Sequence, residues 1–347
     1  MSAYAGLIPL NIVTGFLGSG KTTLLQRLLR SPRLQRTAVL VNEFGEVGLD
    51  HRLLQSVTES TLLLDNGCIC CAIRGDLQEA LRGLLSQRTR GEVPDFDRIV
   101  VETSGLADPV PIAYTVMAEP VLQHHLRLGA IVTTVDAVNG VAQLRDYPEA
   151  VKQVAVADRL IVTKTDLAGP ADVDALHAGL RRLNRSAPIL DATTESEAAD
   201  SLLTDDIYDA EGKAREIAHW RDGAGHDGDA LVHEHADDVH SFALTFDAPM
   251  DWTAFGIWLS MLLNRHGEHV LRVKGLLSVD GLSTPVLING VQHIVHPPSH
   301  LEAWPDGDHR SRLIFIVRGL EQERIEASLA AFNALANAAA PPERMRL

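Results

Sequence analysis

The sequence predicts an α/β protein with a doubly wound, mostly parallel sheet, followed by a small C-terminal α+β domain. Three observations predict this fold. Over roughly the first 200 residues, runs that are apolar on both faces, as in buried parallel strands, alternate with helical segments. A glycine-rich phosphate-binding pattern follows the first apolar run. After an acidic stretch, a strand with alternating polarity begins a second pattern at residue 241.

The elements of the first domain follow from these patterns. A helix is expected directly after the glycine-rich loop, over residues 22–29. Leucines at 77, 81, 84 and 85 share one face of a helical period, which predicts a second helix. The expected strands are residues 10–14, 37–41, 61–64, 98–102, 130–136 and 160–163.

The second domain has a different order of elements. The pattern is strand, helix, three strands and a final helix, which is typical of a small α+β domain. The expected strands are 241–246, 270–279, 286–288 and 312–317, and the expected helices are 252–263 and 321–335. The predicted boundaries are 1–205 for the first domain, 206–240 for an acidic linker, 241–336 for the second domain and 337–347 for a flexible tail.

Charge and hydropathy restrict the partners. A net charge of −15 would repel the phosphate backbone of a nucleic acid, so nucleic-acid binding is not expected. No apolar run reaches the length needed to span a bilayer, and the N-terminus lacks the features of a secretory signal. The three cysteines are odd in number and crowded, unlike a disulfide framework. We therefore expect a cytoplasmic protein that is not bound to a membrane and keeps its thiols reduced.

Residues 15–22, Gly-Phe-Leu-Gly-Ser-Gly-Lys-Thr, match the phosphate-loop pattern G-x-x-x-x-G-K-[ST] between a strand and a helix. Gly15, Gly18 and Gly20 let backbone N–H groups approach phosphates. Lys21 would place its charge on the β- and γ-phosphates, and the Thr22 hydroxyl would bind Mg²⁺. The alternative is a glycine-rich turn that contains Lys and Thr by chance.

A carboxylate that could bind Mg²⁺ is expected at the end of another strand. Glu102 follows an apolar run and is placed to bind Mg²⁺ directly or through water. Gly105, three residues later, allows backbone approach to a γ-phosphate. The alternative interpretation is a helix-capping segment, with Thr103 or Ser104 as the N-cap, and the two interpretations are compatible.

The segment Thr163-Lys164-Thr165-Asp166 resembles the guanine-recognition motif N/T-K-x-D at a strand end. The Asp166 carboxylate can accept hydrogen bonds from guanine N1–H and the exocyclic amine, a donor pair that adenine lacks. The Lys164 stem would cover one face of the base. Thr163 replaces the commoner Asn, and the alternative is a polar loop after a buried strand. Asp136, another carboxylate at a strand end, is expected to be structural.

All three cysteines lie in one short segment, Asn66-Gly67-Cys68-Ile69-Cys70-Cys71. Cys68 and Cys70 point the same way in an extended chain, and a turn can bring Cys71 inward. Three thiolates favour zinc or a similar soft ion and leave one tetrahedral corner open. Glu43 is a candidate fourth ligand. The alternative is a set of packed or redox-active thiols.

The linker contains histidines beside acidic residues. Neutral imidazoles could buffer or load a metal ion there, and a solvated acidic linker is the equal alternative. The histidines in question are His226, His233, His235 and His240.

Taken together, these motifs resemble CobW-type GTPases, which are relatives of the HypB and UreG metallochaperones. The motifs occur in the family's order and the resemblance covers nearly the whole chain, including a C-terminal CobW domain. It implies a P-loop GTPase fold and a GTP-dependent metallochaperone, mostly for zinc. Residues 15–23, Ser19 and Thr23 among them, would bind phosphate and Mg²⁺. The segments that carry the resemblance are residues 15–25, 42–47, 66–71, 102–109 and 163–166.

The expected function is therefore a GTPase with Lys21 and Glu102 in catalytic roles, GTP and Mg²⁺ as cofactors, and Zn²⁺ delivered to a client metalloprotein. Co²⁺ for a cobalamin or cobalt-enzyme pathway is the alternative cargo. A P-loop kinase or ATPase with an incidental thiol site, and a non-catalytic metal store stabilised by nucleotide, are rival classes. The protein is expected to be a monomer or a weak oligomer.

Overall fold

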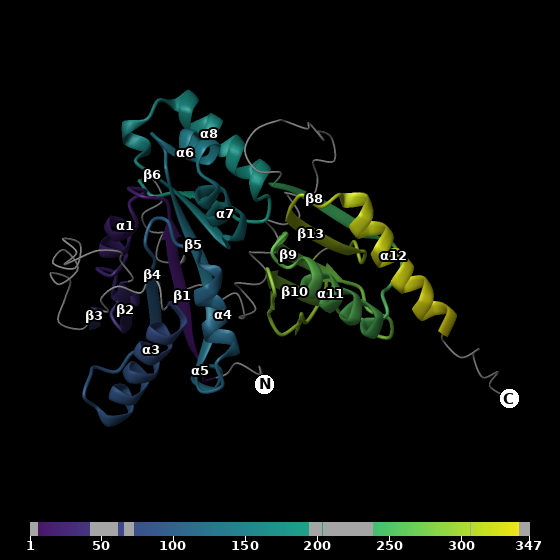
Figure 1. The fold of residues 1–347 in the computed structure, drawn as a ribbon, viewed down its shortest axis with the longest axis horizontal. Helices are drawn as coiled ribbons and strands as arrows, with labels where there is room; N and C mark the ends of the chain where they lie inside the picture. Colours follow the sequence, from purple (N-terminus) through teal and green to yellow (C-terminus); the bar gives the residue numbers. More distant parts are fainter. Residues whose placement is uncertain are drawn as a thin grey trace. The chain divides into compact units, whose positions relative to one another are not determined.

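The computed structural model describes residues 6–41, 62–65, 73–193, 203, 239–305 and 307–339. Side chains of residues 62–65, 73–76 and 336–339 are not described. The chain divides into two compact units, Met1–Trp220 and Arg221–Leu347 (Figure 1). Each unit contains its own sheet and its own apolar core.

The N-terminal unit contains a seven-stranded sheet in the order β3-β2-β4-β1-β5-β6-β7, with every pairing parallel. This confirms the predicted doubly wound α/β class. Because β1 lies between β4 and β5, the strand order reverses at β1, which is where such sheets bind ligands beyond their carboxyl ends. The strands are β1 Ile8–Gly15, β2 Thr37–Val41, β3 Leu62–Asp65, β4 Arg98–Glu102, β5 Leu126–Asp136, β6 Arg159–Thr163 and β7 Ile189–Asp191.

Helices cover both faces of this sheet. Successive side chains of β6 point to opposite faces of the sheet. Ile161 packs with helix α1, whereas Leu160 and Val162 pack with α7 and α8. Alternate apolar positions therefore reach two separate cores. The helices are α1 Lys21–Leu28, α3 Ile73–Arg90, α4 Val110–Ala118, α5 Leu122–His125, α6 Gly140–Asp146, α7 Pro148–Val156 and α8 Pro170–Leu183, with 3-10 turns at Pro32–Leu34 and Thr165–Leu167.

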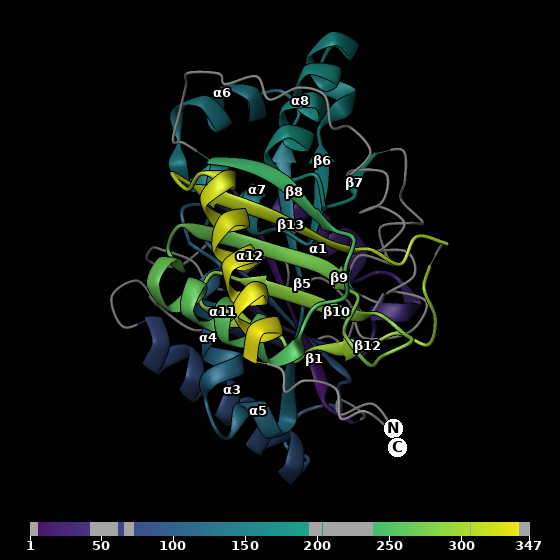
Figure 2. The same cartoon turned by 90° about the vertical axis from the view of Figure 1, so that its right-hand side faces the viewer.

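The C-terminal unit is an antiparallel sheet with both of its helices packed on one face (Figure 2). Phe255 and Trp258 of α11 pack on Phe315 of β13, the strand between β9 and β8, with ring centroids of Trp258 and Phe315 6.3 Å apart. This confirms the predicted α+β class. The elements are β8 Val239–Phe246, α11 Trp252–His266, β9 Val270–Leu277, β10 Val286–Val291, β11 Ile294–Val295, β12 Ser299–His300, β13 Ser311–Arg318 and α12 Gln322–Ala339.

A buried asparagine joins three elements of the N-terminal unit. Asn184, fully buried after α8, donates from Nδ2 to the carbonyl oxygens of Val154 and Ala157 at the end of α7, each at 2.9 Å. Its Oδ1 accepts from the backbone N–H of Ser186 and Ala187 at 3.2 and 3.1 Å, at the turn into β7. The side chain thus satisfies helix-end carbonyls that would otherwise lack partners.

We expect Asn184→Ala to lower the free energy of unfolding by roughly 3 kcal/mol, because several buried polar groups lose their partner at once. Urea unfolding followed by circular dichroism measures the change. The matched control is Arg185→Ala at the next position, which should shift the midpoint little. An unchanged midpoint for Asn184→Ala would show that the asparagine contributes nothing to stability.

Candidate functional site

The phosphate loop follows β1 and has a backbone that requires glycine. Gly15 has φ 141°, and a Cβ there would collide with the hydroxyl and the carbonyl of Thr134 on β5. Gly18 and Gly20 also have positive φ, 73° and 87°. The loop is tied to β5 by a hydrogen bond of 2.6 Å between the Ser19 and Thr134 hydroxyls. These contacts hold the loop at the carboxyl edge of the sheet.

The loop leads directly into α1, whose first N–H groups point toward the loop. Gly20 precedes the helix, and no side chain caps these groups, which is the arrangement that binds anions. Lys21 Nζ donates to the carbonyl oxygens of Gly15 and Phe16, at 2.9 and 3.2 Å. The ammonium group is therefore held over the loop. Thr23, in the same turn, is exposed.

Thr22 and Glu102, predicted to share a magnesium ion, lie together. Thr22 Oγ1 donates to Glu102 Oε1 at 2.5 Å, and Glu102 is 3% exposed at the end of β4. Gly105 lies against the loop, since a Cβ there would come 2.6 Å from the backbone nitrogen of Leu17. The structure thus places oxygen donors and a close backbone segment on the same side of the phosphate loop.

Lys164 joins the predicted guanine motif to the loop. Its Nζ donates to Gly18 O and to Asp136 Oδ2, both at 2.7 Å. The backbone of Lys164 has φ 59°, a left-handed conformation that is uncommon outside glycine. The Thr163 hydroxyl donates to the carbonyl oxygen of Ser19 at 2.8 Å, so the residue in place of the commoner Asn also contacts the loop. Asp166 is exposed at the start of the 3-10 turn after β6.

Asp136 takes part in the site, although we expected a structural residue. The carboxylate is 1% exposed and accepts from the Val138 N–H at 2.8 Å and the Asn139 side chain at 3.0 Å, besides Lys164. Burial alone would raise the pKa of Asp136, but hydrogen bonds from Lys164 and Asn139 hold that pKa below its ordinary value. A carboxylate at the end of β5, the strand that pairs with β1, was the only signal for this role in the sequence.

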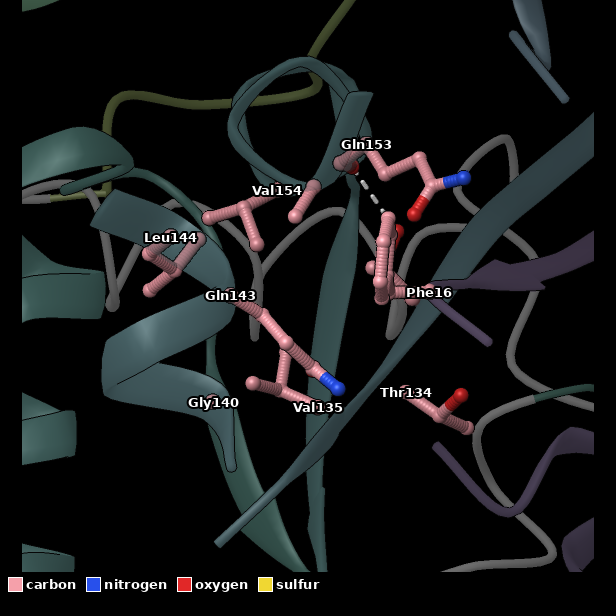
Figure 3. A pocket seen from close by; sticks show the side chains of 10 residues that line it. Phe16, Thr134, Val135, Gly140, Gln143, Leu144, Gln153 and Val154 are labelled. Carbon is pink, nitrogen blue, oxygen red and sulfur yellow. Dashed lines mark hydrogen bonds between the residues drawn. The ribbon is translucent and has the colours of Figure 1, made fainter. Parts of the chain in front are cut away.

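A small pocket lies behind the phosphate loop, between β5 and helices α6 and α7 (Figure 3). Phe16 of the loop, Gln143 and Gln153 line it together with residues of β5. The Phe16 ring packs on Tyr147, which immediately precedes α7, with ring centroids 4.6 Å apart. Gln153 carries no signal in the sequence, because a single glutamine in a helix belongs to no motif.

The predicted metal ligands Glu43, Cys68, Cys70 and Cys71 lie outside the described residues, as do His226, His233 and His235. The described strands nevertheless lead toward them at one edge of the sheet. Val41, the last residue of β2, pairs with Asp65 on one side and with Glu102 on the other. Within the part of the chain that the structure describes, no group of three or more His, Cys, Asp or Glu side chains is arranged to hold a metal ion.

The family model of the CobW/HypB/UreG nucleotide-binding domain matches residues 9–191, and that of the CobW C-terminal domain matches residues 239–333. The chain belongs to this family. The zinc chaperone YjiA of Escherichia coli is 33% identical over 93% of this chain and 98% of its own length. The zinc-regulated GTPase metalloprotein activator 1 of Schizosaccharomyces pombe is 29% identical over 91% of this chain and 83% of its own.

The crystal structure of the Zn(II)-bound YjiA GTPase from E. coli has a TM-score of 0.67 with this chain at 28% identity. The match covers 94% of this chain and 99% of that one. The predicted membership of the CobW-type family is therefore confirmed over both units. Among the described residues, no helix has both the length and the apolar character needed to cross a bilayer.

We expect Asp136→Asn to destabilise this CobW-family chain by about 1–3 kcal/mol at pH 7, because Lys164 loses its buried anionic partner. The folded-state pKa of Asp136 lies below its unfolded-state pKa. The stabilisation is therefore complete above the unfolded pKa of about 4 and decreases as the pH falls toward the folded pKa.

Urea unfolding at several pH values measures this difference between wild type and variant. The difference should shrink below about pH 4. Asp174→Asn, at an exposed position of α8, is the control and should show no such trend. A difference that stays constant down to the acid unfolding of the protein would contradict the assignment.

Proposed function

We propose that this protein is a GTP-dependent metallochaperone. It binds a transition metal ion, with zinc as the cargo, at Cys68, Cys70 and Cys71, takes Glu43 as a fourth ligand, and transfers the metal to a client metalloprotein when GTP is hydrolysed. The names of its relatives, a zinc chaperone and a zinc-regulated GTPase metalloprotein activator, support this function and favour zinc over cobalt.

One observation carries the proposal: the pairing of Val41 with both Asp65 and Glu102 at the carboxyl edge of the sheet. Glu102 pairs in turn with Val13, two residues before the phosphate loop begins at Gly15. Cys68 is only three residues past Asp65 in the sequence. Three residues of chain span at most about 11 Å, so the chain length is compatible with coupling between a thiol site and the proposed nucleotide site.

The described side chains suit the phosphates and magnesium of a nucleoside triphosphate. Lys21 can exchange its loop carbonyls for phosphate oxygens, and α1 directs its N-terminal N–H groups at the same point. Thr22 and Glu102 provide the oxygen donors that Mg²⁺ prefers. When bound, Mg²⁺ would neutralise charge on the β- and γ-phosphates. Lys21 and Glu102 are thus the proposed catalytic residues, and Gly105 presents backbone to the γ-phosphate.

The base is proposed to be guanine. Lys164 is held over the loop by Asp136 and Gly18, so its stem is in place to cover a ring. Asp166 is exposed and open to the guanine N1–H and amine. A kinase or ATPase would have no use for a carboxylate at this point, because adenine lacks the donor pair.

We propose that nucleotide and metal binding are energetically coupled. GTP would order the segments that follow β2 and β3 and raise the affinity for metal, and hydrolysis would lower it. A nucleotide shifts metal binding only by its differential affinity for the two states, about 1.4 kcal/mol for each factor of ten. The coupling is reciprocal, so the metal must tighten GTP binding by the same factor.

We expect Asp166→Ala to weaken GTP binding roughly 10- to 100-fold through lost base hydrogen bonds, with little effect on the already weak binding of ATP. Calorimetric titration of both nucleotides measures the change. Asp172→Ala, on an exposed turn of α8, is the matched control. If wild type binds ATP as tightly as GTP, the protein is not a GTPase of the proposed kind.

We expect zinc to bind at least tenfold more tightly to the protein with a non-hydrolysable GTP analogue than with GDP. Competition against Co²⁺, followed by the thiolate–cobalt absorption band, measures both affinities. Replacing Cys68, Cys70 and Cys71 by Ser should remove the band and leave GTP binding intact. Equal zinc affinities in the two nucleotide states would instead indicate a passive metal store.

A further inference from the structure

Helix α7 contacts both segments that surround the proposed nucleotide site. At its start, Tyr147 packs on Phe16 of the phosphate loop. On its next turns, Lys152 Nζ donates to Asp108 Oδ2 at 2.6 Å, and Gln153 Nε2 donates to the carbonyl oxygens of Gly105 and Ala107 at 3.1 and 3.0 Å. Helix α7 and the residue before it therefore contact both the loop of residues 105–108 and the phosphate loop.

The side-chain amide of Gln153 uses both of its N–H groups for the contact with residues 105–108. The side chain is 1% exposed, and both of its N–H donors have a carbonyl partner. Turning the amide over would place Oε1 against two carbonyl oxygens, so its orientation is determined. The buried Oε1 has no hydrogen-bond partner within the described residues. A buried acceptor without a partner is costly, which indicates that the contact with the 105–108 loop is retained despite a local penalty.

The position of Gly105 depends on this amide. Residues 105–108 lie between β4 and α4 and are not part of the sheet ladder. Gly105 is in close contact with Leu17 of the phosphate loop, because a Cβ on Gly105 would come 2.6 Å from the Leu17 backbone nitrogen. A small shift of residues 105–108 would therefore change how closely the Gly105 backbone approaches a γ-phosphate. The backbone oxygen of Gln153 in turn accepts from Thr133 of β5 at 2.9 Å, which anchors the helix to the sheet.

We propose that Gln153 is a positioning residue that sets the preference of this protein for nucleoside triphosphate over diphosphate. It holds Gly105 where its backbone meets the γ-phosphate, and Lys152 supports the same loop through Asp108. GDP has no γ-phosphate, so its binding does not depend on this loop. This inference rests on the proposed function.

The test is Gln153→Met, which keeps the side-chain volume and removes both N–H donors. We expect the affinity for a non-hydrolysable GTP analogue to fall about tenfold, equivalent to about 1.4 kcal/mol, and the affinity for GDP to stay within about twofold of wild type. Isothermal titration calorimetry on the full chain measures both. A purely structural role would weaken both nucleotides together.

Gln143→Met is the matched control, because Gln143 lines the same pocket from α6 and makes no described side-chain hydrogen bond to residues 105–108. It should leave both affinities unchanged. Lys152→Ala breaks the outer, partly exposed contact to Asp108 and should lower triphosphate affinity in the same direction by about threefold, a change of about 0.6 kcal/mol. If Gln153→Met does not fold, the triphosphate and diphosphate affinities of Lys152→Ala test whether the contact between α7 and residues 105–108 sets the nucleotide preference.

Equal losses for both nucleotides, or no loss in either variant, would overturn the role of Gln153. Wild type distinguishes this failure from a failure of the proposed function. If wild type binds GTP and couples it to zinc while the variants keep wild-type selectivity, only the positioning role of Gln153 is rejected. If wild type does not bind GTP, both the positioning role and the proposed function are rejected.

Discussion

The contact between the buried Asp136 carboxylate and the Lys164 ammonium is the interaction on which the geometry of the proposed nucleotide site depends. Through Lys164, the ends of β5 and β6 are connected to the Gly18 carbonyl of the phosphate loop. The loop is also connected to β5 by the Ser19–Thr134 hydrogen bond and to β6 by Thr163. Three neighbouring parallel strands thus present one continuous polar edge, where a partly buried ion pair is combined with further hydrogen bonds.

The fold class and the phosphate-loop geometry could be predicted because they depend on local patterns. The glycines of the phosphate loop require positive φ or close approach, and such positions are visible in the sequence. The runs at 37–41 and 98–102 coincide with β2 and β4, since a strand buried on both faces is apolar throughout. The sequence also placed Thr22 and Glu102 at one metal site, and their side chains meet.

Other features depend on long-range contacts that no local pattern records. No strand was predicted at β7, because it has only three residues and they are half-buried. No helix was predicted between residues 110 and 183 either. In this range α6 and α7 are short and α4 has few polar residues to mark an outer face, whereas the amphipathic pattern of α8 was visible and was missed. The roles of Asp136 and Gln153 depend on partners 28 and 48 residues away, Lys164 and Gly105, so only the folded sheet reveals them.

The position of Lys21 has a consequence for the free energy of nucleotide binding at the proposed site. A long cationic side chain ordinarily loses rotamer freedom when it grasps an anion, at a cost of roughly 1–2 kcal/mol. Here the ammonium group already rests on the Gly15 and Phe16 carbonyls. In the proposed site, a triphosphate would therefore meet an ammonium group that is already held in place and would exchange hydrogen-bond acceptors with it. Phosphate would bind to a lysine side chain that is already ordered, so little side-chain entropy would be lost on binding.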